Sequence, residues 1–327
     1  MRFALRLMQS LSLACCGGQP TRSLLDGRIG IEGCTLRPFR LPLAEILRRA
    51  YGGAEFDLAE LGLGSYVQCA AGGRCPYVAI PAYPLRSFRH RDVYVRADRI
   101  AAPADLEGKR VGLVDYGMTA AVVLRGLLRD SFGVDTGAIG WVVDGIESPF
   151  GVQPNSPADA AVEAAPEGET LDQLLAAGAI DALIALAPPP CFAAGHPDVA
   201  RLFPDYRKAE AASFAASGVF PIMHVIAMRR ELANRPGLAQ AVYTGFLAAK
   251  NRAMDDLGVT QAPKLTLPWL AAAYEESVAV LGADYWSYGV SRNRSQLDRF
   301  LADAHSDGLT PDRLGIGDVF HPDTLDT

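Results

Sequence analysis

The chain has 327 residues, half of them apolar, so it can bury a sizeable core and is long enough for two lobes. Its net charge of −6 argues against nucleic acid or an anionic membrane surface as the main partner. The longest apolar stretch, residues 219–228, is interrupted by Pro221 and His224, so we expect no membrane-spanning helix.

The N-terminal segment leaves two compartments open. Arg2 and Arg6 precede or interrupt a short apolar stretch, which resembles a secretory signal peptide. No clear cleavage or lipid-attachment pattern follows, and the same residues are typical of an extension leading into a first strand over residues 11–15. We therefore expect a cytoplasmic protein, with a periplasmic location as the alternative if residues 1–16 act as a signal peptide.

The six cysteines contain no C-x-x-C pair and have no histidine at ligand spacing along the chain. This pattern predicts free, mostly buried thiols and no structural zinc site. No Walker-type loop, G-x-S-x-G or dinucleotide fingerprint is present, which argues against kinase, hydrolase and dehydrogenase chemistry.

The middle of the chain alternates between strand and helix patterns. The expected elements are strand 110–115, helix 119–132, strand 139–143, helix 171–178 and strand 180–186. Such alternation predicts a parallel sheet covered by helices. A Pro/Ala-rich insert over residues 148–169 is expected to be a surface excursion.

The flanking segments are less regular. Asp26 and Gly27 are typical of a hairpin turn, and residues 203–217 are expected to form an irregular return. Residues 219–228 predict a buried strand with His224 at its centre. The C-terminal part is expected to be helical over residues 235–257, 267–281 and 295–305.

This layout predicts two α/β lobes with the ligand cleft between the lobes. The first lobe would be discontinuous, made of residues 1–96 and 206–327, and the second would span residues 97–205. A cleft between two lobes is a common place for a small-molecule site.

The turn into the helix at Met118 and Thr119 is one candidate binding feature. Unpaired backbone N–H groups and the helix dipole favour a carboxylate or phosphate at a helix start. Capping of the helix by Thr119 itself is the stronger interpretation from pattern alone.

A basic cluster, Arg86, Arg89, His90 and Arg91, is unusual in an acidic protein. It is either a solvated face or a site where arginine forks bind a dicarboxylate.

His224 stands alone among apolar residues and is either a satisfied core residue or a general acid. Glu60 is a candidate for orienting a histidine or acting as an acid, although a surface or capping carboxylate fits equally well. Ser65 and Tyr66 are weaker candidates near Glu60, and Trp286 and Tyr288 are candidates for an aromatic pocket wall with polar tips.

Several separated blocks together resemble the 4,5-dihydroxyphthalate decarboxylase family over about residues 11–322. They are LSLAC with LLDGRIGIEG, FDLAELGLGSY, VAIPAYPLRSFRHRDVYV, DLEGKRVGLVDYGMTAAVVLRGLLRDSFGV, FPIMHVIAMRREL, DYWSYGVSRNRSQLDRFLADAHSDGL and the DVFHPDT tail. The resemblance implies a two-lobed type 2 periplasmic-binding-protein-like fold. It also implies decarboxylation of a hydroxylated aromatic (di)carboxylic acid by ring protonation and loss of CO₂.

The resemblance implies His224 or His90 as the acid, with Glu60 orienting a histidine. Thr119 and the adjacent N–H groups would anchor a second carboxylate or a phenolate. The expected carboxylate-holding residues are Arg86, Arg89 and Arg125. The scheme requires no organic cofactor and no metal, and its partner is a small aromatic acid, with a homo-oligomer left open.

The chain departs from the family pattern at the expected pocket. The usual tyrosine–aspartate–arginine step after LSLAC is replaced by CGGQPT, and Asp115 and Val123 stand where glutamate and a tryptophan-like residue are usual. Gly62 and Gly64 replace serines. The substrate is therefore not fixed by the resemblance, and a non-catalytic solute-binding protein for a small aromatic carboxylate is the alternative function.

Overall fold

The computed structural model describes residues 9–149, 160–262 and 264–327. It divides into two compact units, each with its own sheet. Unit 1 comprises Met1–Arg86, Ile222–Asp298 and Leu314–Thr327, and unit 2 comprises Ser87–Pro221 and Arg299–Arg313.

Like the predicted first lobe, unit 1 is discontinuous. The boundaries between the units fall at 86/87 and 221/222, and unit 2 also includes residues 299–313. The predicted lobe boundaries at 96/97 and 205/206 stay a prediction.

Unit 1 is built on a five-stranded sheet in the order β2-β1-β3-β11-β4, in which β1 runs parallel to β2 and β3 and β11 runs antiparallel to β3 and β4. Strand β3 is buried along its whole length, as expected for a strand covered on both faces. The strands are β1 (Gln9–Cys15), β2 (Cys34–Arg40), β3 (Leu58–Gly62), β4 (Tyr77–Ile80) and β11 (His224–Arg229).

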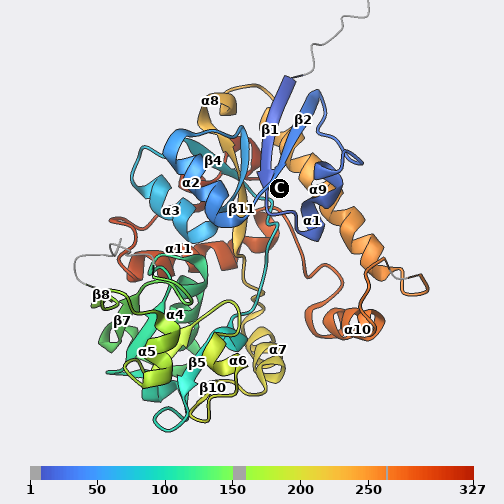
Figure 1. Cartoon of the computed structure of the whole chain (residues 1–327). Helices are drawn as coiled ribbons and strands as arrows, with labels where there is room; N and C mark the ends of the chain where they lie inside the picture. The colour runs from blue at the N-terminus through green and yellow to red at the C-terminus, as the bar shows by residue number, and fades with distance from the viewer. Residues whose placement is uncertain (1–8, 150–159, 263) are drawn as a thin grey trace, which may run out of the picture. The chain divides into compact units, whose positions relative to one another are not determined.

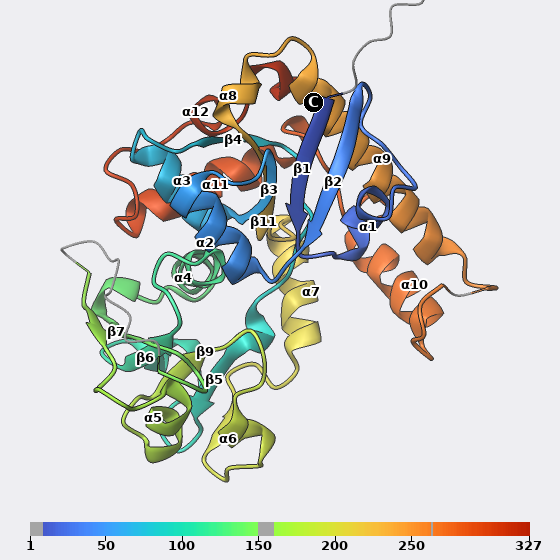
Figure 2. The same cartoon turned by 45° about the horizontal axis from the view of Figure 1, so that its top comes forward.

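The helices of unit 1 pack around this sheet, and α1 lies beside α9 in both views (Figures 1 and 2). They are α1 (Gln19–Leu25), α2 (Leu43–Gly53), α3 (Leu63–Ala71), α8 (Arg230–Ala233), α9 (Leu238–Gly258), α10 (Leu270–Leu281) and α12 (Ile316–Val319). Helix α11 (Arg294–Ser306) begins in unit 1 and continues in unit 2.

Unit 2 contains a six-stranded sheet in the order β10-β5-β9-β6-β7-β8. The central pairs β9–β6, β6–β7 and β7–β8 are parallel, and β5 is antiparallel to both β9 and β10. The strands are β5 (Val93–Arg96), β6 (Arg110–Leu113), β7 (Gly140–Val143), β8 (Val162–Ala164), β9 (Ala182–Ile184) and β10 (Val199–Arg201).

Two helices cover opposite faces of the unit 2 sheet (Figure 2). Apolar residues of α4 (Thr119–Phe132) pack on the face that carries Val111 and Trp141, while α5 (Leu171–Ala177) packs on the face that carries Val142. Unit 2 also contains α6 (Pro190–Ala193), α7 (Tyr206–Ser217) and the second part of α11. The predicted alternation of strand and helix in this region is therefore present.

Three local predictions are wrong. Residues 26–27 do not form a hairpin, because Pro20 opens helix α1 and the chain crosses through it to make β2 parallel to β1. Residues 203–217 contain helix α7, whose start is capped by the Asp205 side chain and which ends at Gly218. The strand predicted over 219–228 begins only at His224, since Pro221 has no N–H to offer a ladder.

Two predictions fall partly outside the described residues. The signal-peptide alternative concerns residues 1–16, of which 1–8 are not described, and the insert at 148–169 includes residues 150–159, which are not described either. Among the residues that are described, no helix combines the length and apolar character needed to cross a bilayer.

Candidate functional site

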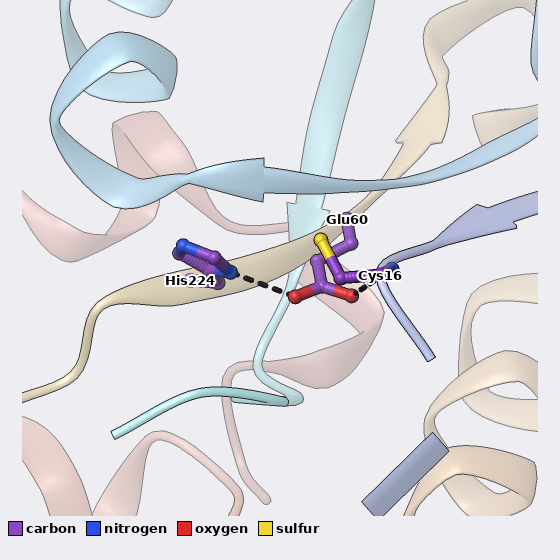
Figure 3. A group of neighbouring side chains, drawn as sticks. All are labelled: Cys16, Glu60 and His224. Atoms are coloured by element: carbon purple, nitrogen blue, oxygen red, sulfur yellow. Dashed lines mark hydrogen bonds and ion pairs between the residues drawn. The ribbon is translucent and has the colours of Figure 1, made fainter. Parts of the chain in front are cut away.

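Three strands of unit 1 bring Cys16, Glu60 and His224 together (Figure 3). Cys16 directly follows β1, Glu60 lies within β3, and His224 opens β11. In the β3–β11 ladder Glu60 pairs with Ile226 and His224 with Gly62. Glu60 and His224 are thus diagonal neighbours on one face of the sheet, close enough for long side chains to meet.

The Glu60 carboxylate joins the other two residues. Its Oε1 lies 2.7 Å from Nδ1 of His224, and its Oε2 accepts a hydrogen bond of 2.9 Å from the backbone N–H of Cys16. Glu60 is only 3% exposed. A buried carboxylate at Nδ1 fixes the orientation of an imidazole and favours the tautomer with its proton on that nitrogen.

Cys16 is the most accessible residue of the three. Burial of the thiol and the neighbouring Glu60 carboxylate raise the pKa of Cys16 to about 12, so the thiol is neutral at pH 7. Its place in the site was not predicted. The available signal was its position after the first strand, in the segment that departs from the family pattern.

A second polar cluster of unit 1 surrounds Arg86, which is 4% exposed. The guanidinium donates hydrogen bonds to the backbone oxygen of Ser287 and to the side-chain oxygens of Asn293 and Gln296. Burial lowers the pKa of Arg86 to about 10, which still leaves it charged at pH 7. Arg86 therefore places a buried positive charge in this part of unit 1.

Tyr288 lies near the same cluster. Its ring packs edge-on against Tyr83, with 5.9 Å between centroids. Within the described part of the chain its buried hydroxyl has no hydrogen-bond partner. Burial and, to a lesser extent, the charge of Glu60 raise the pKa of Tyr288 well above its usual value. The hydroxyl therefore stays protonated and can donate.

Two of the predicted carboxylate-holding arginines are paired with internal carboxylates in unit 2. Arg89 contacts Asp92 at 2.9 Å, and Arg125 contacts Asp307 at 2.7 Å, with both members of each pair nearly inaccessible. These contacts give both arginines a structural role.

His90 is also in unit 2 and is 3% exposed. Its ring packs against Phe203 with 5.2 Å between centroids, and burial lowers the pKa of His90 to about 4. His90 is therefore a neutral imidazole at pH 7, which makes it a poor proton donor.

Three further candidates make internal hydrogen bonds in unit 1. Ser65 donates to the backbone oxygen of Gly62 at 3.0 Å, and Trp286 donates to that of Tyr83, also at 3.0 Å. The Tyr66 hydroxyl donates to the backbone oxygen of Val319 and accepts from the N–H of Ala79.

The start of α4 differs from the capping interpretation. Met118 is the residue that precedes the helix and makes no side-chain cap, whereas Thr119 occupies the first helical position. Thr119 is 7% exposed. The Asp115 carboxylate already accepts hydrogen bonds from the N–H groups of Gly117 and Met118 at this end, and the first-turn N–H groups beyond them are a favourable place for an anion.

The candidates thus divide between the two units. Unit 1 holds Glu60, Ser65, Tyr66, Arg86, His224, Trp286 and Tyr288, and unit 2 holds Arg89, His90, Met118, Thr119 and Arg125. The ligand cleft expected between the lobes stays a prediction.

Comparison with known proteins gives two similar curated sequences. The chain is 40% identical over 322 residues to a 4,5-dihydroxyphthalate decarboxylase from Comamonas testosteroni, covering 97% of this chain and 98% of that protein. It is also 40% identical over 205 residues to a 4,5-dihydroxyphthalate decarboxylase from Pseudomonas putida, covering 61% of this chain and 80% of that protein. No protein-family model matches the chain.

Solved structures with a similar fold include two binding proteins. The periplasmic aliphatic sulphonate binding protein SsuA from Escherichia coli matches with a TM-score of 0.53 and 16% identity, covering 95% of this chain and 92% of that one. The alkanesulfonate-binding protein SsuA from Xanthomonas axonopodis pv. citri, bound to MOPS, matches with a TM-score of 0.53 and 15% identity, covering 94% and 96%. At this identity the likeness shows the fold alone, which is periplasmic-binding-protein-like, as predicted.

Proposed function

Because this chain belongs to the 4,5-dihydroxyphthalate decarboxylase family, we propose that it is a carbon–carbon lyase acting on 4,5-dihydroxyphthalate or a closely related hydroxylated aromatic acid. The reaction removes one carboxyl group as CO₂. We also propose, from the N-terminal pattern, that the enzyme acts in the cytoplasm.

The chemistry follows from the substrate. In 4,5-dihydroxyphthalate each ring carbon that carries a carboxylate lies para to a hydroxyl group. Electron donation from that hydroxyl lets the ring carbon accept a proton. The bond to the carboxylate then breaks, its electron pair restores the aromatic ring, and CO₂ leaves, so that one proton replaces one carboxyl group. The reaction needs a proton donor and a fixed carboxylate, and the scheme calls for no organic cofactor.

His224 is our proposed proton donor, with Glu60 as its positioning residue. The observation that carries this proposal is the 2.7 Å contact between Glu60 and Nδ1 of His224, held by the pairing of two buried strands. His90 fits the role less well, because burial keeps its pKa near 4.

For the substrate carboxylates we propose Arg86 and the first turn of α4 at Met118 and Thr119. Arg86 contributes a buried positive charge, and a helix start favours an anion through its dipole. Arg89 and Arg125 fit this role less well, because each already contacts an internal carboxylate.

A non-catalytic solute-binding protein is the second candidate function, and the likeness to the two SsuA structures is the observation that favours it. The fold serves binding and catalysis equally well, so fold alone does not separate them. A binding protein needs no proton donor beside its ligand, whereas the Glu60–His224 pair supplies one.

The test is CO₂ release from purified protein with 4,5-dihydroxyphthalate and a panel of hydroxybenzoates, with chelator present throughout. We expect turnover by the wild type and a fall in kcat of about 10²–10⁴-fold in His224→Ala, the usual range for loss of a general acid. His90→Ala is the matched control and should keep its kcat within a few-fold, provided circular dichroism shows it folded. If the protein binds the acids but releases no CO₂, the decarboxylase proposal is wrong and the solute-binding function stands. If only His90→Ala loses kcat, His90 and not His224 is the proton donor.

A further inference from the structure

The Glu60–His224 pair has a third neighbour with metal-binding chemistry, the thiol of Cys16. The Cys16 Sγ, a carboxylate oxygen of Glu60 and a ring nitrogen of His224 all lie within 4.8 Å of one another (Figure 3). The three residues come from three segments that strand pairing holds in place. Their convergence is thus built into the sheet of unit 1.

These are the ligand types that zinc prefers. Zn²⁺ binds Cys sulfur at about 2.3 Å and His nitrogen or carboxylate oxygen at about 2.0–2.2 Å, so neighbouring ligand atoms of a tetrahedral site lie roughly 3–4 Å apart. The observed limit of 4.8 Å requires only small side-chain movements to reach that spacing. A mixed sulfur, nitrogen and oxygen set also disfavours Mg²⁺ and Ca²⁺, which take oxygen ligands.

The surroundings of Glu60 support such a site. Its second oxygen is held by the backbone N–H of Cys16, so the carboxylate is oriented even before an ion binds. Outer hydrogen bonds of this kind orient metal ligands in known sites. Glu60 is buried while Cys16 is the most accessible of the three, which leaves an approach for an ion from the Cys16 side.

We propose that Cys16, Glu60 and His224 form a three-ligand site for Zn²⁺ or a similar thiophilic divalent cation. Three protein ligands leave the fourth tetrahedral position open to water or to a substrate oxygen. On binding, the Cys16 thiol loses its proton to solvent and its sulfur bonds to the ion. The ion also displaces the proton between Glu60 and His224, because metal and proton require the same lone pairs.

A consequence for catalysis rests on the proposed function. If His224 is the acid, an ion bound to it removes the proton donor, and zinc inhibits the decarboxylase. Binding itself does not depend on the reaction, so the two can be tested separately.

The first experiment uses Co²⁺ as a spectroscopic probe on the full chain, reduced and stripped of metal. We expect a near-ultraviolet thiolate-to-cobalt absorption band that saturates at one equivalent and disappears on adding Zn²⁺. Cys16→Ser should lack the band, whereas Cys191→Ser, which alters a partly exposed thiol in unit 2, should retain it. No band in the wild type, or an unchanged band in Cys16→Ser, would overturn the site.

The second measurement is Zn²⁺ affinity by competition with a chromophoric chelator. Loss of an outer hydrogen bond typically weakens a metal site about 10–100-fold, so loss of a direct ligand in Cys16→Ser should weaken it at least about tenfold. Equal affinities in the two proteins would contradict the proposal.

Inhibition is then measured as the ratio of CO₂ release with and without Zn²⁺ for each protein. Wild type should be inhibited, and Cys16→Ser should need at least about tenfold more Zn²⁺ for the same ratio. A cobalt band without any zinc inhibition would overturn the inhibitory role but support the site. Absence of CO₂ release from every protein would refute the proposed function, while the cobalt band would still decide the site.

Discussion

At the scale of single residues, His90 makes the stability of the protein depend on pH. Burial lowers the pKa of His90 from the ordinary 6.5 to about 4, and its ring contacts are Phe88 and Phe203. Between these two pH values the unfolded chain binds a proton that the folded chain does not. The folded state is therefore favoured above about pH 6.5, and this contribution is lost as the pH falls towards 4.

We expect the wild type to lose up to about 2 kcal/mol more free energy of unfolding between pH 7 and pH 5 than His90→Phe, which cannot titrate. Urea titrations of both proteins at the two pH values measure the difference. Equal losses in both proteins would show that the pKa of His90 is not lowered in the folded protein.

Glu60 and His224 show how much of the candidate site was predictable. An apolar strand with one histidine was visible in the sequence, and orientation of a histidine was one of the alternatives for Glu60. The contact itself joins residues 164 positions apart and depends on the register of β3 with β11. Local pattern carries no information on register between distant strands, so Cys16 was missed and the choice of histidine stayed open.

At the scale of elements, α4 and α11 are joined by buried charges within unit 2. Asp307 follows α11 and contacts Arg125 and Arg129 of α4 at 2.7 and 2.5 Å. Gly126 permits the approach of α11 to α4, because a Cβ there would clash with the Asp303 carboxylate. Arg125 and Asp307 are 1% and 2% exposed, so neither charge has water as an alternative partner.

Asp307→Asn should therefore lower the free energy of unfolding by about 3–5 kcal/mol, the usual cost of leaving a buried charge without its partner. Asp312→Asn, at an exposed position, is the matched control and should change it by less than about 0.5 kcal/mol. Urea unfolding followed by far-ultraviolet circular dichroism measures both variants. A loss below about 1 kcal/mol in Asp307→Asn would return Arg125 to the substrate-binding candidates.

Elements with strong local signals were predicted best. Helix α4 has the predicted bounds, and Gly133 ends it in the left-handed conformation, with φ of 67°. The predicted hairpin at Asp26 and Gly27 was wrong. These two residues resemble a hairpin turn locally, but the parallel pairing of β1 with β2 is decided by contacts between distant residues. The α7 region shows the opposite case, since its Asp205 cap and its terminal Gly218 are local signals that the sequence contains.

At the scale of the whole molecule, binding of an aromatic acid and its decarboxylation should be separable, because only decarboxylation needs the ring hydroxyl groups. Phthalate keeps both carboxylates of 4,5-dihydroxyphthalate but lacks the hydroxyl groups. Without a para hydroxyl to donate electrons, the ring carbon is too weakly basic to take a proton from an imidazolium, and no CO₂ can leave.

We therefore expect phthalate to inhibit decarboxylation competitively and to release no CO₂. It should also stabilise the folded protein, by about 2.7 kcal/mol at a concentration one hundred times its Kd. Thermal unfolding over a phthalate series, with benzoate as the control that lacks the second carboxylate, measures this effect. Equal stabilisation by benzoate would show that only one carboxylate is held, and no stabilisation by either acid would show that binding depends on the hydroxyl groups instead.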